Sequence, residues 1–427
     1  MSGDDADLFE LARELFPIAR SLTGNGVRRT LEILGDRVPL EVSEVPSGTE
    51  VYDWVVPPEW NVRAAWISDA DGRRIVDFSD SPLHLVGYSQ PVQTQLSGRE
   101  LDAHLHSLPH EPDATPYRTS YYDRTWGFCL PDSRRSGLDP DATYEAFVDS
   151  TLDDTGSLTY GEVVIPGRSE DEFLVSTYIC HPSLANDNVS GIAVAAGLAA
   201  CIAPGELRLT IRLLFAPSGI GSLAWLQRNE RHLPRIRAGL VVACAGDAGP
   251  LNYKRSRRGN TLVDRAAAHV LRRRPGARTR DFVPWGTDER QFCSPGFDLP
   301  VGTLTRTPNG EYPGYHTSLD DLDLITPDAL GDSLAALVEI VRTVDAAAIL
   351  ERTEPRGEPQ LSRHGIDGRM TASLLAGAES SNALFWLLNL ADGTRDLLEI
   401  ADQADVPLLD LAALASSLEQ KGILRRS

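Results

Sequence analysis

The sequence lacks any apolar run approaching the roughly 20 residues that a membrane-spanning helix takes. Its first residues, MSGDDAD, are acidic, whereas a signal peptide begins with a basic segment. Lysine is scarce, and 61 acidic against 41 basic residues give a formal net charge of −20, which repels the phosphates of nucleic acid. We therefore expect a cytoplasmic protein that binds neither a membrane nor nucleic acid.

Cysteine is sparse as well. The five cysteines are scattered and never form a CxxC pair, which fits a reducing compartment and excludes both a disulfide framework and a cysteine-ligated structural zinc. Cys180 precedes His181, but neighbouring residues of a strand point to opposite faces. A Cys–His nucleophile is therefore disfavoured.

The remaining composition is that of an ordinary globular protein, with 42% hydrophobic and 24% charged residues, and 427 residues predict two or three domains. Residues 5–35 have the apolar periodicity of two helices. From about 37 to 110, short alternating stretches with Pro and Gly between them predict a small, mainly β domain inserted into the chain.

The largest part, residues 1–36 and 111–349, predicts an α/β core. Apolar strands alternate with helices there, which indicates a mixed sheet covered on both faces. The strands are expected at TYGEVVI, EFLVSTYI, LRLTIRLLFA, GLVVACAG and DLPVGTLT, and the helices at 188–202, 219–230, 260–273, 288–293 and 327–349.

Residues 350–370 form a polar segment with Pro and Gly, which predicts a linker. Three amphipathic stretches in 371–427 then indicate a winged-helix-like module. DNA binding is one hypothesis for such a module, but residues 381–427 hold seven acidic and four basic side chains, and a DNA-binding module is normally basic. A docking or dimerisation element is favoured, and formation of a homo-oligomer stays open.

The stretch VSTYICHPSLANDNVSG predicts a buried strand that ends in a polar loop carrying His181 and Asp187, followed by a helix. This is how α/β proteins place ligands at the carboxyl edge of a sheet. The alternative is that Asp187 caps the helix and His181 is an ordinary loop residue.

Three further polar groups follow predicted strands. Asp247 follows GLVVACAG, WGTDERQF supplies Asp288 and Glu289, and YHTSLDD supplies His316. Imidazole and carboxylate ligands beyond different apolar strands, without a thiolate pair, are what one or two hydrolytic zinc ions need.

The order HPSLANDNVSG, strand-ending Asp, TDERQF and YHTSLDD resembles the co-catalytic zinc aminopeptidases of peptidase clan MH. More closely, RSLTGNGVRRTL, YDWVVPPEWNV, PYRTSYYDRTWGFC and GDAGPLNYKRSRRGNTLVDR are similar to an aminopeptidase-like family with a C-terminal winged helix, often found near genes of polysaccharide or natural-product biosynthesis. The resemblance runs from about residue 8 to the C-terminal module.

By position, the resemblance implies that Asp187 bridges two metals and that His181, Asp247 and His316 complete the ligand set. It further implies that five residues orient a ligand or line the substrate pocket, namely Asp288, Tyr253, Arg255, Arg258 and Tyr315.

One departure from the family is clear. The clan has a Glu-Glu pair after the next strand, whereas FAPSGIGSLAWL places Ser218 where the base is expected, and residues 207–229 contain no Asp or Glu. Three accounts stay open: a base borrowed from Glu289 or Glu311, different chemistry on the same scaffold, or ligand binding without turnover.

The resemblance implies a zinc-dependent hydrolase that cleaves an amide bond next to a free amine, in a peptide or an aminoacyl conjugate. The alternative is a catalytically impaired relative that binds a peptide-like ligand or a partner.

Overall fold

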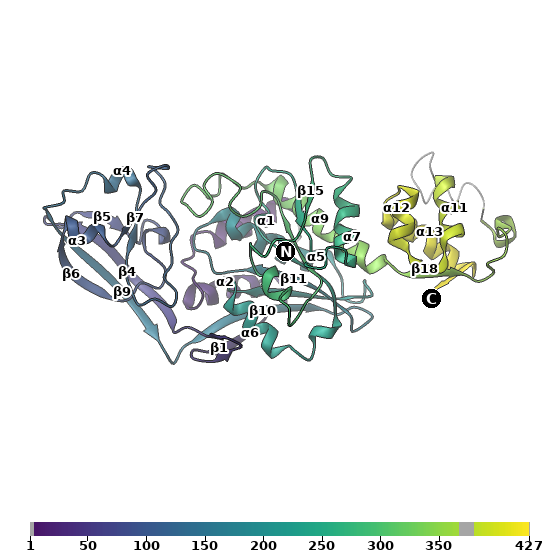
Figure 1. Cartoon of the computed structure of the whole chain (residues 1–427), viewed down its shortest axis with the longest axis horizontal. Helices are drawn as coiled ribbons and strands as arrows, with labels where there is room; N and C mark the ends of the chain where they lie inside the picture. The colour runs from purple at the N-terminus through teal and green to yellow at the C-terminus, as the bar shows by residue number, and fades with distance from the viewer. Residues whose placement is uncertain (1–3, 367–379, 427) are drawn as a thin grey trace.

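The computed structural model describes residues 4–366 and 380–426 of the chain. Figure 1 shows three parts in a row: a small β domain at one end, an α/β core in the middle, and a helical module at the other end. The predicted α/β fold class, with a mixed sheet and a C-terminal winged helix, is confirmed.

The core contains an eight-stranded sheet. Its strands, in spatial order, are β1 (Glu41–Pro46), β10 (Ser157–Ile165), β12 (Thr210–Ala216), β11 (Glu172–Tyr178), β13 (Ile236–Val242), β16 (Val301–Thr305), β14 (Asn252–Lys254) and β15 (Arg278–Arg280). The four strands from β12 to β16 run parallel, whereas β1, β10 and β14 pair antiparallel with their neighbours towards the sheet centre. The carboxyl ends of the parallel strands therefore meet at one edge.

Helices cover both faces of this sheet, as the continuous apolar strands require. All seven residues of β11 are buried. One face carries α1 (Asp5–Leu15), α5 (Gly191–Cys201), α7 (Leu262–Leu271) and α9 (Pro327–Ala346), which pack on one another. The other face carries α6 (Ile220–Arg228) and α8 (Glu289–Phe292). Helix α2 (Asn25–Gly35) packs on β10, and its buried apolar side chains belong to the same core cluster as those of α1.

The inserted domain has other boundaries than 37–110. Its four-stranded sheet consists of β5 (Arg74–Asp77), β4 (Glu59–Asp69), β9 (Thr143–Asp153) and β6 (Val92–Ser97), whereas β1 belongs to the core sheet. Short pairs and helices complete the region: β2 (Glu50–Val51) with β3 (Trp54–Val55), β7 (Leu105–His106) with β8 (Phe128–Cys129), α3 (Gly98–Asp102) and α4 (Asp132–Arg135). Alternating stretches such as LEVSEV predict a strand but not which sheet it joins.

The C-terminal module starts earlier than predicted. Residues 350–352, expected as the start of a linker, belong to β17 (Ile349–Arg352), which pairs with two strands of the module. The module further contains α11 (Ser380–Leu390), β18 (Asp392–Asp396), α12 (Leu397–Ala404), α13 (Leu408–Gln420) and β19 (Leu424–Arg426). A four-residue strand within a polar stretch gives too little alternation to be recognised.

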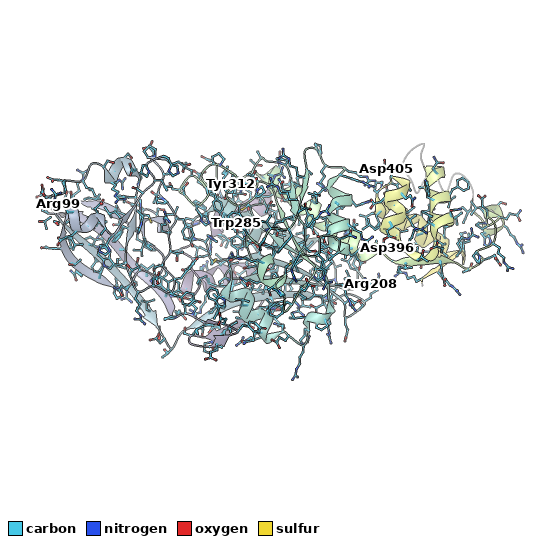
Figure 2. The ribbon with its side chains drawn as sticks, viewed as in Figure 1. Arg99, Arg208, Trp285, Tyr312, Asp396 and Asp405 are labelled. Carbon is cyan, nitrogen blue, oxygen red and sulfur yellow. The ribbon has the colours of Figure 1, made fainter. Side chains whose placement is uncertain are left out.

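Acidic side chains of the module face basic side chains of α7 in the core. Arg265 Nη2 lies 2.5 Å from the Asp396 carboxylate, and His269 Nδ1 lies 2.6 Å from that of Asp402. Asp405 approaches two arginines that follow α7 at 3.5 and 3.7 Å; Figure 2 labels Asp396 and Asp405 on this side of the module. These charges thus pair within the chain.

None of the helices in the described part of the chain is both long and apolar enough to cross a membrane.

The close approach of α5 to β13 gives a test of the packing. A Cβ on Gly191 would lie 2.7 Å from the Val242 carbonyl oxygen, whereas a Cβ on Gly35, exposed in α2, would meet nothing within 4 Å. Gly191→Ala should therefore lower the free energy of unfolding by about 1–3 kcal/mol. The matched Gly35→Ala should raise it by about 0.5–1 kcal/mol, because alanine favours a helix over glycine. Urea denaturation of both variants measures the two changes, and a neutral Gly191→Ala would contradict this packing.

Candidate metal centre

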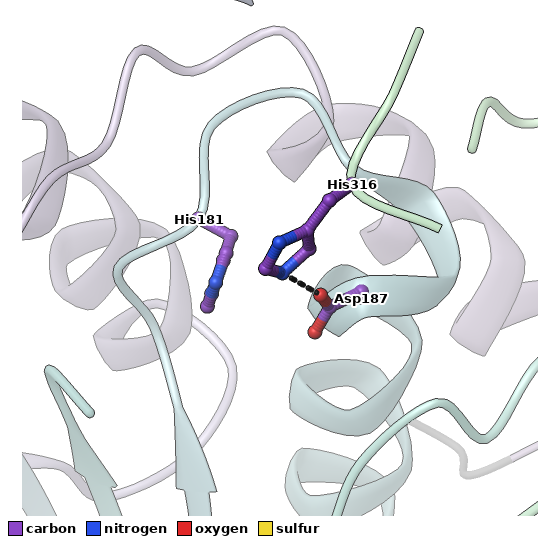
Figure 3. Close-up of side chains that lie close together, drawn as sticks. All are labelled: His181, Asp187 and His316. Atoms are coloured by element: carbon purple, nitrogen blue, oxygen red, sulfur yellow. Dashed lines mark ion pairs between the residues drawn. The ribbon is translucent and has the colours of Figure 1, made fainter. Parts of the chain in front are cut away.

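Three side chains from distant parts of the sequence meet at the carboxyl edge of the core sheet. His181 follows β11, Asp187 lies in the irregular turn η2 (Ala185–Ser190) before α5, and His316 lies between β16 and α9, as Figure 3 shows. One ligand atom of each lies within 4.8 Å of the other two. The sequence prediction that these three residues converge agrees with this geometry.

The facing atoms of Asp187 and His316 are close but lack hydrogen-bond partners. His316 Nε2 and Asp187 Oδ2 lie 2.9 Å apart, yet both are buried without a hydrogen bond. The His181 and His316 ring centroids are 5.3 Å apart. Buried polar atoms normally have partners, so these atoms are arranged for a group between them.

The surroundings hold Asp187 in place. Tyr178, at the end of β11, donates its hydroxyl hydrogen to Asp187 Oδ1, and Asn309 Nδ2 donates to that hydroxyl at 3.2 Å. The Asp320 carboxylate accepts the backbone N–H groups of Asn186 at 2.6 Å and Asp187 at 3.0 Å. The turn and its carboxylate are therefore fixed from both sides.

The charge states suit metal binding. Burial lowers the pKa of His181 to about 4, so its imidazole is neutral at pH 7 and keeps a free lone pair. Burial alone would raise the pKa of Asp187, but the two imidazoles and the Tyr178 hydroxyl outweigh it, and the pKa falls below its usual range. The cluster thus offers a neutral nitrogen from His181 and an ionised oxygen from Asp187.

Tyrosines and one arginine that the sequence analysis did not select complete the surroundings. The centroid of the Tyr117 ring lies 5.1 Å from that of His181 and 5.2 Å from that of His316. The backbone N–H of Tyr117 donates to the His316 carbonyl at 2.7 Å. Arg20 Nε donates to the His181 carbonyl at 2.9 Å. Tyr117 lies between β6 and β9, so the inserted region contributes directly to the site. Both residues lie in family-like motifs, RSLTGNGVRRTL and PYRTSYYDRTWGFC, which were the signal available.

Asp247 does not join the cluster, contrary to its prediction as a ligand. One of its oxygens accepts from Gly249 N–H at 2.6 Å and Thr307 Oγ1 at 2.7 Å, and the other from Asn186 Nδ2 at 2.9 Å and Thr307 N–H at 3.1 Å. With four donors its carboxylate is satisfied, and it positions the turn through Asn186.

The two carboxylates predicted as replacement bases are also occupied. Glu289 is fully buried, with Oε1 2.6 Å from Lys254 Nζ and Oε2 accepting the Thr287 hydroxyl at 2.8 Å. Glu311 pairs with Arg280 through two contacts, at 2.5 and 2.9 Å. Neither carboxylate is free to accept a proton, so the geometry does not support that role.

Of the residues predicted to line the substrate pocket, only Tyr315 reaches the cluster. Its ring stacks on His316 with centroids 4.0 Å apart. Tyr253 is buried and donates to Asp264 at 2.7 Å, while Arg258 pairs with Asp298 at 2.9 Å. Arg255 lies in a separate hollow beside α7, and Asp288 lies beside Ser218 at the start of α6. The position of a residue in a motif, which was the basis for these predictions, does not fix the direction of its side chain.

The residues present fit a zinc ion. Two imidazoles and one carboxylate are the three-ligand set of catalytic zinc sites, which keep a further position open. In the described residues this is the one group of three or more His, Cys, Asp or Glu side chains with converging ligand atoms. The geometry therefore fits one ion, held by His181, Asp187 and His316.

Sequence comparison places the chain among aminopeptidase-like proteins. The family model "Domain of unknown function (DUF4910)" matches residues 9–347, and a winged helix-turn-helix model matches residues 348–426. A protein of Clostridium acetobutylicum, provisionally named for polysaccharide biosynthesis with an aminopeptidase-like domain, is 42% identical over 420 residues, which is 98% of this chain and 96% of the relative.

Solved structures agree with this placement. A crystal structure of a Clostridium acetobutylicum protein, provisionally called a peptidase, has a TM-score of 0.93 at 41% identity and covers 99% of this chain and 96% of its own. A zinc aminopeptidase of Bacillus subtilis has a TM-score of 0.58 at 12% identity, covering 79% of this chain and 94% of its own. The second likeness establishes the aminopeptidase-like fold and nothing finer.

The ligand assignment can be tested by zinc binding. His181→Ala and His316→Ala should each weaken zinc affinity by more than about 100-fold, and Tyr178→Phe by about 10–100-fold, because ligand-orienting hydrogen bonds typically contribute that much. Isothermal titration calorimetry with Zn²⁺ measures this on the full chain. His232→Ala, at an exposed histidine outside the cluster, is the matched control. Unchanged affinity in the first two variants would refute the site.

Proposed function

We propose a hydrolytic function for this chain, which belongs to the DUF4910 family and carries a C-terminal winged helix-turn-helix. The reaction is zinc-dependent cleavage of an amide bond next to a free amine, in a peptide or an aminoacyl conjugate. The observation that carries the proposal is the pair of buried atoms Asp187 Oδ2 and His316 Nε2, which lie 2.9 Å apart without a hydrogen bond, with His181 beside them.

The residues of the chain have separate tasks in this reaction. A zinc ion bound by His181, Asp187 and His316 would polarise the substrate carbonyl and lower the pKa of water. Tyr178 fixes the orientation of Asp187, and Arg20 fixes the loop of His181 through its carbonyl oxygen. The rings of Tyr117 and Tyr315 pack against the imidazoles and limit the directions in which these can turn.

The names of the relatives support the choice of reaction and of substrate class. The structural neighbours include zinc aminopeptidases, and the 42% identical relative is named for polysaccharide biosynthesis with an aminopeptidase-like domain. An aminoacyl conjugate made in a biosynthetic pathway is a substrate class that agrees with both names, aminopeptidase and polysaccharide biosynthesis.

A second candidate is ligand binding without turnover. Ser218 stands where the related hydrolases have a carboxylate, and a general base of this kind typically contributes about 10²–10⁴-fold to the rate. A protein without such a base would still hold zinc and a peptide-like ligand.

For the winged-helix module we propose a docking role within the chain. Its carboxylates Asp396 and Asp402 are engaged with α7, and its net negative charge disfavours nucleic acid.

Hydrolysis of aminoacyl-p-nitroanilides distinguishes the two candidates. The zinc-loaded chain should release nitroaniline, lose the activity with a chelator, and regain it when zinc is restored, because the proposed reaction requires the ion. Ser218→Glu is the informative variant. The wild type would favour the second candidate, ligand binding without turnover, if it binds zinc but barely hydrolyses the substrate and if Ser218→Glu greatly increases the rate. Activity that survives complete removal of zinc would contradict the proposal.

A further inference from the structure

We propose that Ser218 and Asp288 together form the proton acceptor of this site, in place of the glutamate that the sequence lacks. This inference rests on the proposed hydrolytic function. It assigns the base to a hydroxyl–carboxylate pair whose two members lie 70 residues apart in the sequence.

The pair lies beside the ligand segment. Ser218 follows β12, the parallel neighbour of β11, so it leaves the sheet at the same edge as His181. Its backbone N–H donates to Cys180 Sγ at 3.3 Å, and that sulfur lies 3.7 Å from His181 Nδ1. Cys180 thus contacts both the backbone of Ser218 and the imidazole of a proposed metal ligand.

The hydroxyl and the carboxylate are joined directly. Ser218 Oγ donates to Asp288 Oδ1 at 3.0 Å, and the backbone N–H of Gly219 donates to the same oxygen at 2.7 Å. Asp288 Oδ2 is buried and has no hydrogen-bond partner. An ionised carboxylate with one oxygen unpaired in the interior has room to take up a proton.

Access is provided by the hydroxyl. Asp288 is 1% exposed, whereas Ser218 is half-buried and lines a hollow of about 180 Å³. Aromatic side chains form the other walls of this hollow: Trp54, Tyr121 and Tyr122. A molecule in the hollow therefore meets Ser218, whose hydroxyl is hydrogen-bonded to the buried carboxylate.

The proton transfer balances. As water attacks the substrate carbonyl, its proton passes to Ser218 Oγ while the Ser218 hydroxyl proton passes to Asp288 Oδ1, which leaves serine neutral and Asp288 protonated. When the amide C–N bond breaks, the same steps in reverse deliver the proton to the leaving amine. No oxidant, reductant or further reactant is needed.

Of Asp288 and the buried thiol of Cys180 nearby, Asp288 is the group that changes its charge near pH 6. Burial raises the pKa of Asp288 to about 6, although the hydrogen bonds from Gly219 and Ser218 favour its ionised form. Cys180 stays a neutral thiol, because burial raises its pKa to about 12. The neighbouring Glu289 is compensated by the Lys254 ammonium at 2.6 Å.

The test combines kinetics and infrared spectroscopy on the full zinc-loaded chain, with leucyl-p-nitroanilide as the probe. The wild-type kcat should fall as the pH drops through about 6, because the ionised form of Asp288 is the acceptor. Asp288→Asn should lower kcat by about 10²–10⁴-fold and abolish that pH dependence, and Ser218→Ala should lower kcat in the same range.

The infrared measurement needs no substrate. The carbonyl band of protonated Asp288, identified by its loss in Asp288→Asn, should titrate near pH 6. In Ser218→Ala its midpoint should move to higher pH, since the lost hydrogen bond favoured the ionised form. The matched control is Ser256→Ala, which removes a serine hydroxyl that donates to the buried carboxylate of Asp264 at 2.6 Å, away from the site, and should change neither kcat nor the band.

The outcomes separate the two proposals. An unshifted band in Ser218→Ala, or full kcat with an unchanged pH profile in Asp288→Asn, overturns the pair. A further outcome is that the band shifts in Ser218→Ala while the wild type hydrolyses no aminoacyl-nitroanilide. That result supports the coupling of Ser218 with Asp288 and overturns the hydrolytic function. If Asp288→Asn fails to fold, the band is identified instead by its midpoint near pH 6 in wild type, and its shift or lack of shift in Ser218→Ala decides.

Discussion

The buried carboxylate of Asp187, facing two imidazoles, is the interaction on which the site depends. An ionised carboxylate in the protein interior requires compensating charge or hydrogen bonds. Tyr178 supplies a hydrogen bond to one oxygen, while the other faces His316 and has no hydrogen bond. A cation at this point compensates the remaining charge, and the parallel strands of the core bring the ligands together by ending at one edge.

The same edge explains how a hydrolase could work with Ser218. The Asp288 carboxylate comes from the segment before α8, a different part of the chain from β12, and reaches the space beside Ser218. Metal ligation and proton acceptance are then divided between separate residues. The Glu-Glu pair of related enzymes, one residue acting as base and one as ligand, has no counterpart after β12.

Much of the fold and part of the site could be predicted from the sequence. Continuous apolar strands alternating with helices determine an α/β core, and polar residues at strand ends identified His181, Asp187 and His316. The same rule failed for Asp247, because a residue's place at the edge does not reveal its partners, here Thr307 and Asn186. Tyr117 and Tyr178 lie within quoted motifs but were not singled out, since ring packing across distant segments leaves no local pattern that distinguishes one tyrosine from its neighbours. The pairing of β1 with the core sheet and of β9 with the small sheet is likewise non-local.

The central claim is that one zinc ion lies between His181, Asp187 and His316. Anomalous X-ray diffraction on crystals of the zinc-loaded protein, recorded above and below the zinc absorption edge, tests it most directly. The account predicts a single anomalous peak in contact with Asp187 Oδ2 and with one ring nitrogen of each histidine. A peak elsewhere, or none at this position in crystals that contain zinc, would contradict it.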